Sequence, residues 1–138
     1  MKANELMAGN WVRSKKWAEK PFKITRINEK EKYYYGITSD GKQVGPFLIE
    51  ELEPITLTTD ILEKNGFEKV YDKHKLPNYR IKLNSYTDLY FTVFTGVDGY
   101  WNPVGLGVLT GGIPATVDYV HQLQHALRLC RIKKEIEL

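Results

Sequence analysis

The sequence predicts an α+β fold: an N-terminal small SH3-like β-barrel followed by a helix, a three- or four-stranded antiparallel sheet and a C-terminal helix. Three observations lead to this prediction. Residues 11–57 contain about five short segments rich in β-branched and aromatic residues, separated by tight turns, as in a small barrel. Residues 58–66 carry the start and stop signals of a helix. Residues 117–130 repeat apolar side chains at helical spacing.

The N-terminal strands are predicted from their turns. Asp40-Gly41 is a strong hairpin signal, because glycine tolerates the positive φ that such turns need. Pro54 lacks the N–H that a central ladder requires, so the segment around it is expected at the edge of the sheet. The expected strands begin at Trp11 and cover residues 22–27, 33–38, 42–49 and 52–57.

The segment after Pro54 reads as a short capped helix. Thr58 or Thr59 can accept a hydrogen bond from the free N–H groups of the first turn. Gly66 is expected to adopt a positive φ and to end the helix, with Phe67 packing back on Leu62. A helix of about two turns is unstable alone in water, so it must dock on other elements. We therefore expect two parts, a small β-barrel over residues 1–58 and an α-β-β-β-α unit over residues 59–138, that share a core.

Further strands and a second helix are expected after this point. Asp98-Gly99 is a second hairpin signal, and the four glycines of residues 105–114 predict a loop or a frayed edge of the sheet. Thr116 is expected to cap the last helix. The expected strands are 68–72, 79–83, 88–95 and 100–104, and the expected apolar stripe of the helix is Val117, Val120, Leu123, Leu127 and Cys130.

The amino-acid composition only weakly constrains the partner class and the cellular compartment. The 138 residues carry 20 basic and 17 acidic side chains, a net charge of +3 that is weak evidence for a polyanionic partner. A single cysteine excludes a disulfide within the chain and fits a reducing cytosol. No apolar run approaches the ~20 residues of a membrane span, and residues 1–9 lack the apolar block of a signal peptide. We therefore expect a cytoplasmic protein with no membrane partner.

The sequence contains no convincing catalytic, metal or cofactor motif. His121 and His125 lie one helical turn apart, but Gln122 stands where a zinc protease needs a glutamate as general base, so we expect no metal site. We instead expect these residues on a polar helix face with Gln124 and Arg128. The glycine-rich segment lacks the Lys-Ser/Thr of a phosphate-binding loop. Cys130, on an apolar stripe, is expected to be buried and inert. We expect no cofactor.

A basic stretch over residues 11–26 is a candidate nucleic-acid-binding surface. Cationic side chains alternate there with Trp11, Trp17 and Phe22, a combination that can hold single-stranded nucleic acid by charge and stacking. The alternative is that Trp11 and Phe22 are core residues and that the lysines form a solvated loop. The candidate binding residues are Arg13, Lys15, Lys16, Trp17, Lys20 and Lys23.

The C-terminal helix is the leading candidate for a partner-binding surface. Its apolar arc is wider than one sheet face requires, which is typical of surfaces that bind another protein. Residues 131–138 contain three more aliphatic side chains that could extend the helix outward and dock a second chain, or fold back on the protein's own core. The candidate partner-binding residues are Tyr119, Gln122, Ala126, Arg128, Leu129 and Ile132.

Three stretches resemble a family. They are NELMAGNWV at residues 4–12, LEPITLTTDILEKNGF at residues 52–67 and YVHQLQHAL at residues 119–127. On these stretches the chain resembles an uncharacterised family of short bacterial proteins frequently encoded on prophages and mobile elements. The resemblance implies a cytoplasmic bacterial or viral setting and carries over no activity, cofactor or catalytic residue.

Taken together, these observations favour a non-enzymatic protein-binding or adaptor protein of a phage or mobile element. Its partner would be another protein, from the host, the virus or a second copy of the chain. The alternative is a nucleic-acid-binding accessory protein that uses residues 11–26. An enzyme is the least favoured class, because no residue pattern specifies a reaction.

Overall fold

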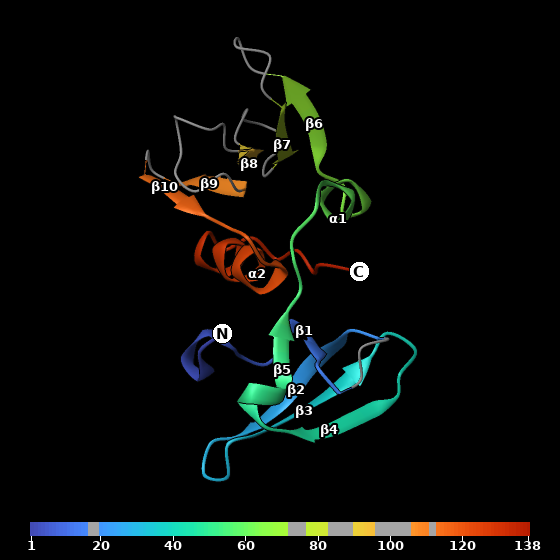
Figure 1. The fold of residues 1–138 in the computed structure, drawn as a ribbon. Coiled ribbons are helices and arrows are strands. Elements are labelled where there is room, and N and C mark those ends of the chain that lie inside the picture. Colours follow the sequence, from blue (N-terminus) through green and yellow to red (C-terminus); the bar gives the residue numbers. More distant parts are fainter. Residues whose placement is uncertain (17–19, 72–76, 83–89, 96–105, 111–112) are drawn as a thin grey trace. The chain divides into compact units, whose positions relative to one another are not determined.

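The computed structural model describes residues 1–16, 20–71, 77–82, 90–95, 106–110 and 113–138. This part of the chain has a mixed α+β structure with two five-stranded antiparallel sheets and a C-terminal helix (Figure 1). Residues 1–56 and 119–121 form one compact unit, here the N-terminal unit, and residues 57–118 and 122–138 form the C-terminal unit. No helix among the described residues is long and apolar enough to span a membrane.

The N-terminal unit is built on a sheet of strand order β4-β3-β2-β1-β5. β5 lies at the edge, as Pro54 predicts, because its missing N–H removes nothing from the ladder there. Two short 3-10 helices, η1 and η2, accompany the strands. The elements are η1 (Ala3–Glu5), β1 (Trp11–Ser14), β2 (Phe22–Asn28), β3 (Tyr33–Thr38), β4 (Gln43–Phe47), η2 (Ile49–Glu51) and β5 (Leu52–Pro54).

The turn between β3 and β4 is the predicted hairpin. Gly41 has φ +84°, and its N–H donates to the carbonyl oxygen of Thr38 over 3.0 Å. The Thr38 side chain closes the turn further, because its hydroxyl oxygen accepts a bond from the Lys42 N–H. The hairpin prediction at Asp40-Gly41 is therefore confirmed.

One face of this sheet carries a compact apolar core. Phe22 and Phe47 stack at its centre, with ring centroids 5.1 Å apart. Gly36 lies against that stack, since a Cβ there would come within 2.3 Å of the Phe22 ring, so the aromatic pair itself requires glycine. The buried members of the core are Leu6, Val12, Phe22, Ile24, Tyr34, Val44, Phe47 and Leu52.

An irregularity in β2 decides which residues face away from this core. The β2–β3 register shifts between Ile24 and Arg26, so that one extra residue, Thr25, enters β2. Without it, Arg26 would share the core face of Ile24, because side chains alternate along a strand. The bulge instead pairs Arg26 with Tyr35 on the outer face.

The C-terminal unit contains the second sheet, of order β10-β9-β8-β7-β6. The expectation of three or four strands was too low. Residues 105–114, expected as a loop or a frayed edge, contribute β9 and the start of the edge strand β10, and Gly107 pairs with both Phe94 and Thr116. Partners on both sides outweigh the weak strand preference of glycine. The strands are β6 (Glu68–Tyr71), β7 (Pro77–Lys82), β8 (Tyr90–Thr95), β9 (Leu106–Thr110) and β10 (Ile113–Thr116). The Asp98-Gly99 turn and the strand expected at 100–104 lie outside the described residues.

The first helix, α1 (Thr59–Lys64), has the predicted ends. The Thr58 hydroxyl oxygen accepts the Ile61 N–H at 3.3 Å, which caps the first turn. Gly66 has φ +80°, and the Phe67 N–H donates to the Leu62 carbonyl oxygen at 3.0 Å. Leu62 and Phe67 are both buried. Positive φ at glycine with this backward hydrogen bond is the glycine-terminated helix end that the sequence predicts.

The C-terminal helix, α2 (Val120–Leu129), starts later than predicted. Thr116 does not cap it, because that residue pairs with Gly107 as the last residue of β10. The Gln122 amide oxygen instead accepts the N–H of Asp118 at 2.8 Å. Cys130 follows the helix and is exposed, so the expectation that it is buried on the apolar stripe was wrong.

Residues 131–138 do not extend α2, contrary to one of the two expectations. Arg131 has φ +57°, and the Ile132 N–H closes the helix end on the Leu127 carbonyl oxygen at 2.8 Å. The tail then folds back within its own unit. Ile136 is 1% exposed, and the Asn65 side chain holds the backbone N–H and carbonyl of Glu137 at 2.8 and 2.7 Å.

Candidate functional site

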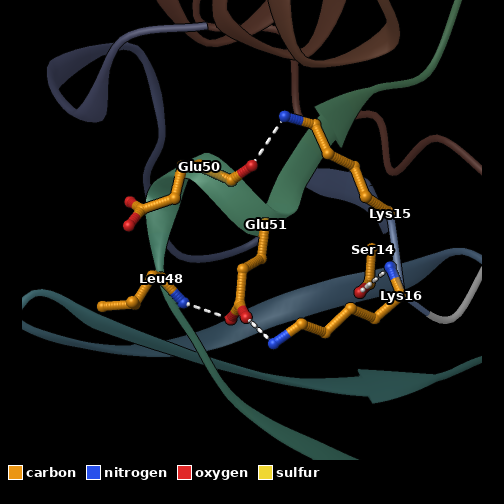
Figure 2. Close-up of polar contacts among 6 residues, drawn as sticks. All are labelled: Ser14, Lys15, Lys16, Leu48, Glu50 and Glu51. Carbon is orange, nitrogen blue, oxygen red and sulfur yellow. Dashed lines mark hydrogen bonds and ion pairs between the residues drawn. The ribbon is translucent and has the colours of Figure 1, made fainter.

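Two lysines of the basic stretch of the N-terminal unit bond to η2. Figure 2 shows Lys15 and Lys16, which follow β1, reaching Glu50 and Glu51 of η2. The Lys15 ammonium donates to the Glu50 carbonyl oxygen at 2.6 Å, and the Lys16 ammonium pairs with the Glu51 carboxylate. Glu51 also accepts the Leu48 N–H at 2.9 Å. The charge of Lys16 is therefore partly neutralised before any ligand arrives, and the Lys15 ammonium is already engaged by a backbone carbonyl.

Hydrogen bonds lower the pKa values of two carboxylates in this region, those of Glu51 and Asp40. Hydrogen bonds from Lys16 and from the Leu48 N–H hold the pKa of Glu51 below its usual range. Hydrogen bonds from the Thr38 hydroxyl and from Lys20 do the same for the pKa of Asp40, whose carboxylate lies 3.2 Å from the Lys20 ammonium. Lys20 is thus the second candidate cation, after Lys16, that pairs with a carboxylate.

Two of the three aromatic residues of the predicted interface are buried. Trp11 is 6% and Phe22 2% exposed, so neither ring can stack on a nucleic-acid base. The alternative expectation, that both are packed residues, is the one the structure supports. Trp17 lies outside the described residues. Trp11 and Phe22 therefore do not act with the cations of this stretch as stacking rings.

The bulge in β2 brings other residues together on the outer face of the first sheet. The Arg26 guanidinium lies 4.1 Å from the centre of the Tyr35 ring, and the Lys23 ammonium lies 5.3 Å from the centre of the Trp11 ring. A groove of about 450 Å³ opens beside Tyr35. We call it the sheet-face groove; its lining includes Thr25, Arg26, Tyr35, Ile37, Gln43 and Gly45.

A second surface lies at the end of α2, in the C-terminal unit. Leu129 is 84% exposed, although it is a large apolar residue on a helix that is otherwise well packed. Beside α2 lies a groove of about 690 Å³. Four of its lining side chains are basic. We call Leu129 and this groove the C-terminal surface; the groove lining includes Arg128, Arg131, Ile132, Lys133, Lys134 and Glu135.

The predicted partner-binding residues divide between this surface and structural roles. Arg128, Leu129 and Ile132 belong to the C-terminal surface. Gln122 acts instead at the start of α2, through the Asp118 N–H. Tyr119 stacks on His121 with ring centroids 5.8 Å apart, so its ring is engaged within the N-terminal unit. Ala126 is half-buried.

The two helical histidines occupy different environments. His121 is 1% exposed and Gln124 is also buried, so the expectation of one polar helix face for both was wrong. Burial, together with the nearby Arg128 charge, lowers the pKa of His125 below its ordinary value. No group of three or more His, Cys, Asp or Glu side chains in the described ranges is arranged to hold a metal ion.

Comparisons with known proteins identify no relative of this chain, so the candidate sites are argued from their geometry alone. No family model, no curated protein and no solved structure matches the chain.

Two features were missed in the sequence. Lys133 and Lys134 extend the basic cluster begun by Arg128 and Arg131, and a count of charges over residues 128–134 would have found them. The pairing of Arg26 with Tyr35 depends on a bulge, for which the sequence carries no comparable signal.

Proposed function

We propose that the protein is a non-enzymatic binding or adaptor protein of a phage or mobile element, acting in the cytoplasm on another protein through the C-terminal surface. The observation that carries the proposal is the 84% exposure of Leu129, which follows directly in sequence on Arg128, a lining residue of the basic groove. A large apolar side chain rimmed by charge is a common feature of surfaces that bind a partner. Burying Leu129 fully would contribute about 1.5–3 kcal/mol to association before its costs.

The charge of the groove selects the partner. Arg128, Arg131, Lys133 and Lys134 face one carboxylate, that of Glu135, in the groove lining. A segment that combines acidic residues with one apolar anchor is complementary to this surface. Stabilisation of the helix end explains only some of these four basic residues. Cations in the last helical turn are stabilised by the helix dipole, but Lys133 and Lys134 lie beyond that turn.

Arg131 is the second support for the proposal. It occupies the left-handed position after α2, with φ +57°, where glycine would fit without strain. A non-glycine residue at this backbone conformation costs roughly 1 kcal/mol. The side chain that bears this cost lines the basic groove. Strain at a residue that also faces a candidate site is consistent with a binding role.

The test is affinity capture from the natural host with wild-type protein and two charge-matched variants. Leu129→Asp introduces a carboxylate into the C-terminal surface. Tyr71→Asp introduces one at another exposed residue, 61% accessible, on the edge strand β6. We expect one dominant acidic partner to be lost with Leu129→Asp and retained with Tyr71→Asp.

Two outcomes would contradict the proposal. Capture of the same proteins by wild-type and Leu129→Asp would remove the surface from the interaction. Binding of the purified partner that is insensitive to an Arg128→Glu/Lys133→Glu double variant would remove the charge argument, since reversed charges across an interface cost several kcal/mol. Light scattering of the protein alone separates a second copy from a foreign partner.

For the N-terminal unit we infer a small SH3-like barrel. Two features of the sheet support it: β1 pairs with both β2 and β5, and the single-turn η2 separates β4 from β5. Bulges in the β2–β3 and β3–β4 pairings provide the bends that curl a sheet. Backbone nuclear Overhauser effects between β4 and β5 would report closure, and an assigned spectrum without them would indicate an open sheet.

A further inference from the structure

We propose that the outer face of the first sheet binds single-stranded nucleic acid, with Arg26 as its central contact. This site is separate from the C-terminal surface and does not depend on the function proposed for it. Three cationic side chains follow one another on this face: Arg13 on β1, then Lys23 and Arg26 on β2. The site differs from the predicted basic stretch because it excludes Lys15, Lys16 and Lys20, which bond to η2 or to Asp40.

The register of the sheet places these three cations together. Trp11 pairs with Lys23, and Arg13 lies two residues beyond Trp11 on the same side of β1. Lys23 pairs with Ile37 and Arg26 with Tyr35, two residues apart on β3. The bulge at Thr25 is what keeps Arg26 on this side. The bulge at Thr25 therefore places Arg26 on the same face as Arg13 and Lys23.

Arg26 is exposed and is held in a geometry suited to a nucleic acid. Its guanidinium lies 4.1 Å from the Tyr35 ring centre, so its position is fixed while its outer N–H groups can donate to a phosphate. Within the described part of the chain, Arg26 forms no ion pair with a carboxylate. An unpaired arginine gives up no internal ion pair when it binds a phosphate.

The sheet-face groove provides the non-ionic part of the site. Its volume of about 450 Å³ is within the usual range for small-molecule sites and can accept a base. Thr25 and Gln43 supply hydrogen-bonding groups at its lining, and Ile37 supplies an apolar surface. A base that entered the groove could stack on the guanidinium–Tyr35 pair.

These features favour a single strand over a duplex and over an acidic protein. A duplex hides the faces of its bases, so it could use the cations but not the stacked Arg26–Tyr35 pair. An acidic peptide would use the same cations without needing a flat stacking surface. Glu53, which pairs with Arg13 on edge strand β5, limits the basic face at that end.

The experiment measures fluorescence polarisation of a labelled strand of 12 deoxythymidines with the full chain, at salt concentrations from 50 to 200 mM. We expect weak, salt-dependent binding, with a dissociation constant of roughly 10⁻⁴–10⁻⁶ M. Arg26→Ala should weaken binding about fivefold or more. It should also reduce the slope of log affinity against log salt by about 0.7, one phosphate contact.

Matched variants separate the site from general charge. Lys30→Ala removes the same charge from an exposed turn after β2 and should leave affinity nearly unchanged. Arg26→Lys keeps the charge and should restore the salt slope but not the full affinity, because an ammonium cannot stack as a guanidinium does. Circular dichroism of each variant checks that the sheet is intact.

Four results would overturn the proposal. The first is no binding of the strand at 50 mM salt. The second is an equal loss in Arg26→Ala and Lys30→Ala, which would mean diffuse charge only. The third is tighter binding of a duplex of the same length, which would mean backbone attraction without stacking. Binding of an acidic peptide in competition with the strand would assign the face to protein instead.

Discussion

Gly66 and Arg131 occupy the same place in two different helices. Each follows the helix in a left-handed conformation, with φ +80° and +57°, and in each case the next residue donates its N–H back into the helix. Only one of them is glycine. The pair therefore allows the same backbone requirement to be tested in both directions.

Gly66→Ala should destabilise the protein by about 1 kcal/mol. A Cβ at Gly66 would meet nothing within 4 Å, so the expected loss comes from the backbone conformation and not from a clash. Urea denaturation measures it. Gly66→Asn is the control and should lose less, because asparagine tolerates this conformation better. Equal stability of the alanine variant and wild type would contradict the helix-end assignment.

Arg131→Gly should stabilise the protein by about 0.5–1 kcal/mol, by relieving the left-handed strain. The same change removes a cation from the C-terminal surface, so partner affinity should fall while stability rises. The two readouts are a denaturation midpoint and binding of the captured partner. A variant that gains stability and binds equally well would show that Arg131 has no role in binding.

His125 should make the protein less stable as the pH falls below about 6.5. Burial and Arg128 lower its pKa in the folded state, so the unfolded chain takes up the proton at a higher pH. Acid therefore favours unfolding over this range, and the stability is present above the unfolded pKa. Urea midpoints at pH 7.5 and 5.5 should differ less in His125→Gln than in wild type. An identical drop in both would assign the effect to other groups.

At the scale of the element, the tail is the clearest case of a segment whose role depends on its contacts. Ile136 is 1% exposed, and Glu137 is held on both backbone groups by Asn65 at the end of α1. Lys64 also donates to the Leu138 carbonyl oxygen. Residues 136–138 of the tail therefore stabilise the fold, whereas Ile132 to Glu135 line the groove of the C-terminal surface.

Ile136→Ala should cost about 2–4 kcal/mol, because it leaves a cavity in a buried position. Truncation after Arg131 should lower the melting temperature at least as much and should also weaken partner binding, since it removes Lys133 and Lys134. Lys133→Ala is the control for stability, as that side chain is exposed. An Ile136→Ala melt equal to wild type would mean that the tail is not docked in solution.

At the scale of the whole molecule, the two proposed surfaces belong to different units of the chain. The sheet-face groove lies in the N-terminal unit and the C-terminal surface in the C-terminal unit, with no residue in common. Effects of mutations that share no partners usually add. Arg26→Ala should therefore weaken binding of the labelled strand and leave binding of the captured protein unchanged. Leu129→Asp should weaken binding of the captured protein and leave binding of the strand unchanged. A loss of both ligands in either variant would indicate a single shared site.

The sequence by itself determined the elements whose signals are local. The Thr58 cap, the Gly66 helix end, the Asp40-Gly41 hairpin and the edge position of Pro54 each depend on the chemistry of a few adjacent residues, and each is as predicted. Local backbone preferences and capping bonds act over three or four residues, so they can be read in one stretch of sequence.

The tertiary structure decided what depends on distant partners. Strand β9 forms in spite of Gly107 because it pairs with β8 on one side and with β10 on the other, and Cys130 is exposed because α2 ends before it. Lys16 and Lys20 pair with carboxylates 35 and 20 positions away, and Lys15 donates to a backbone carbonyl 35 positions away. Arg26 joins the outer face only through a bulge set by pairing with β3. Burial, register and ion pairing are properties of which segments meet, and periodicity along one segment does not contain them.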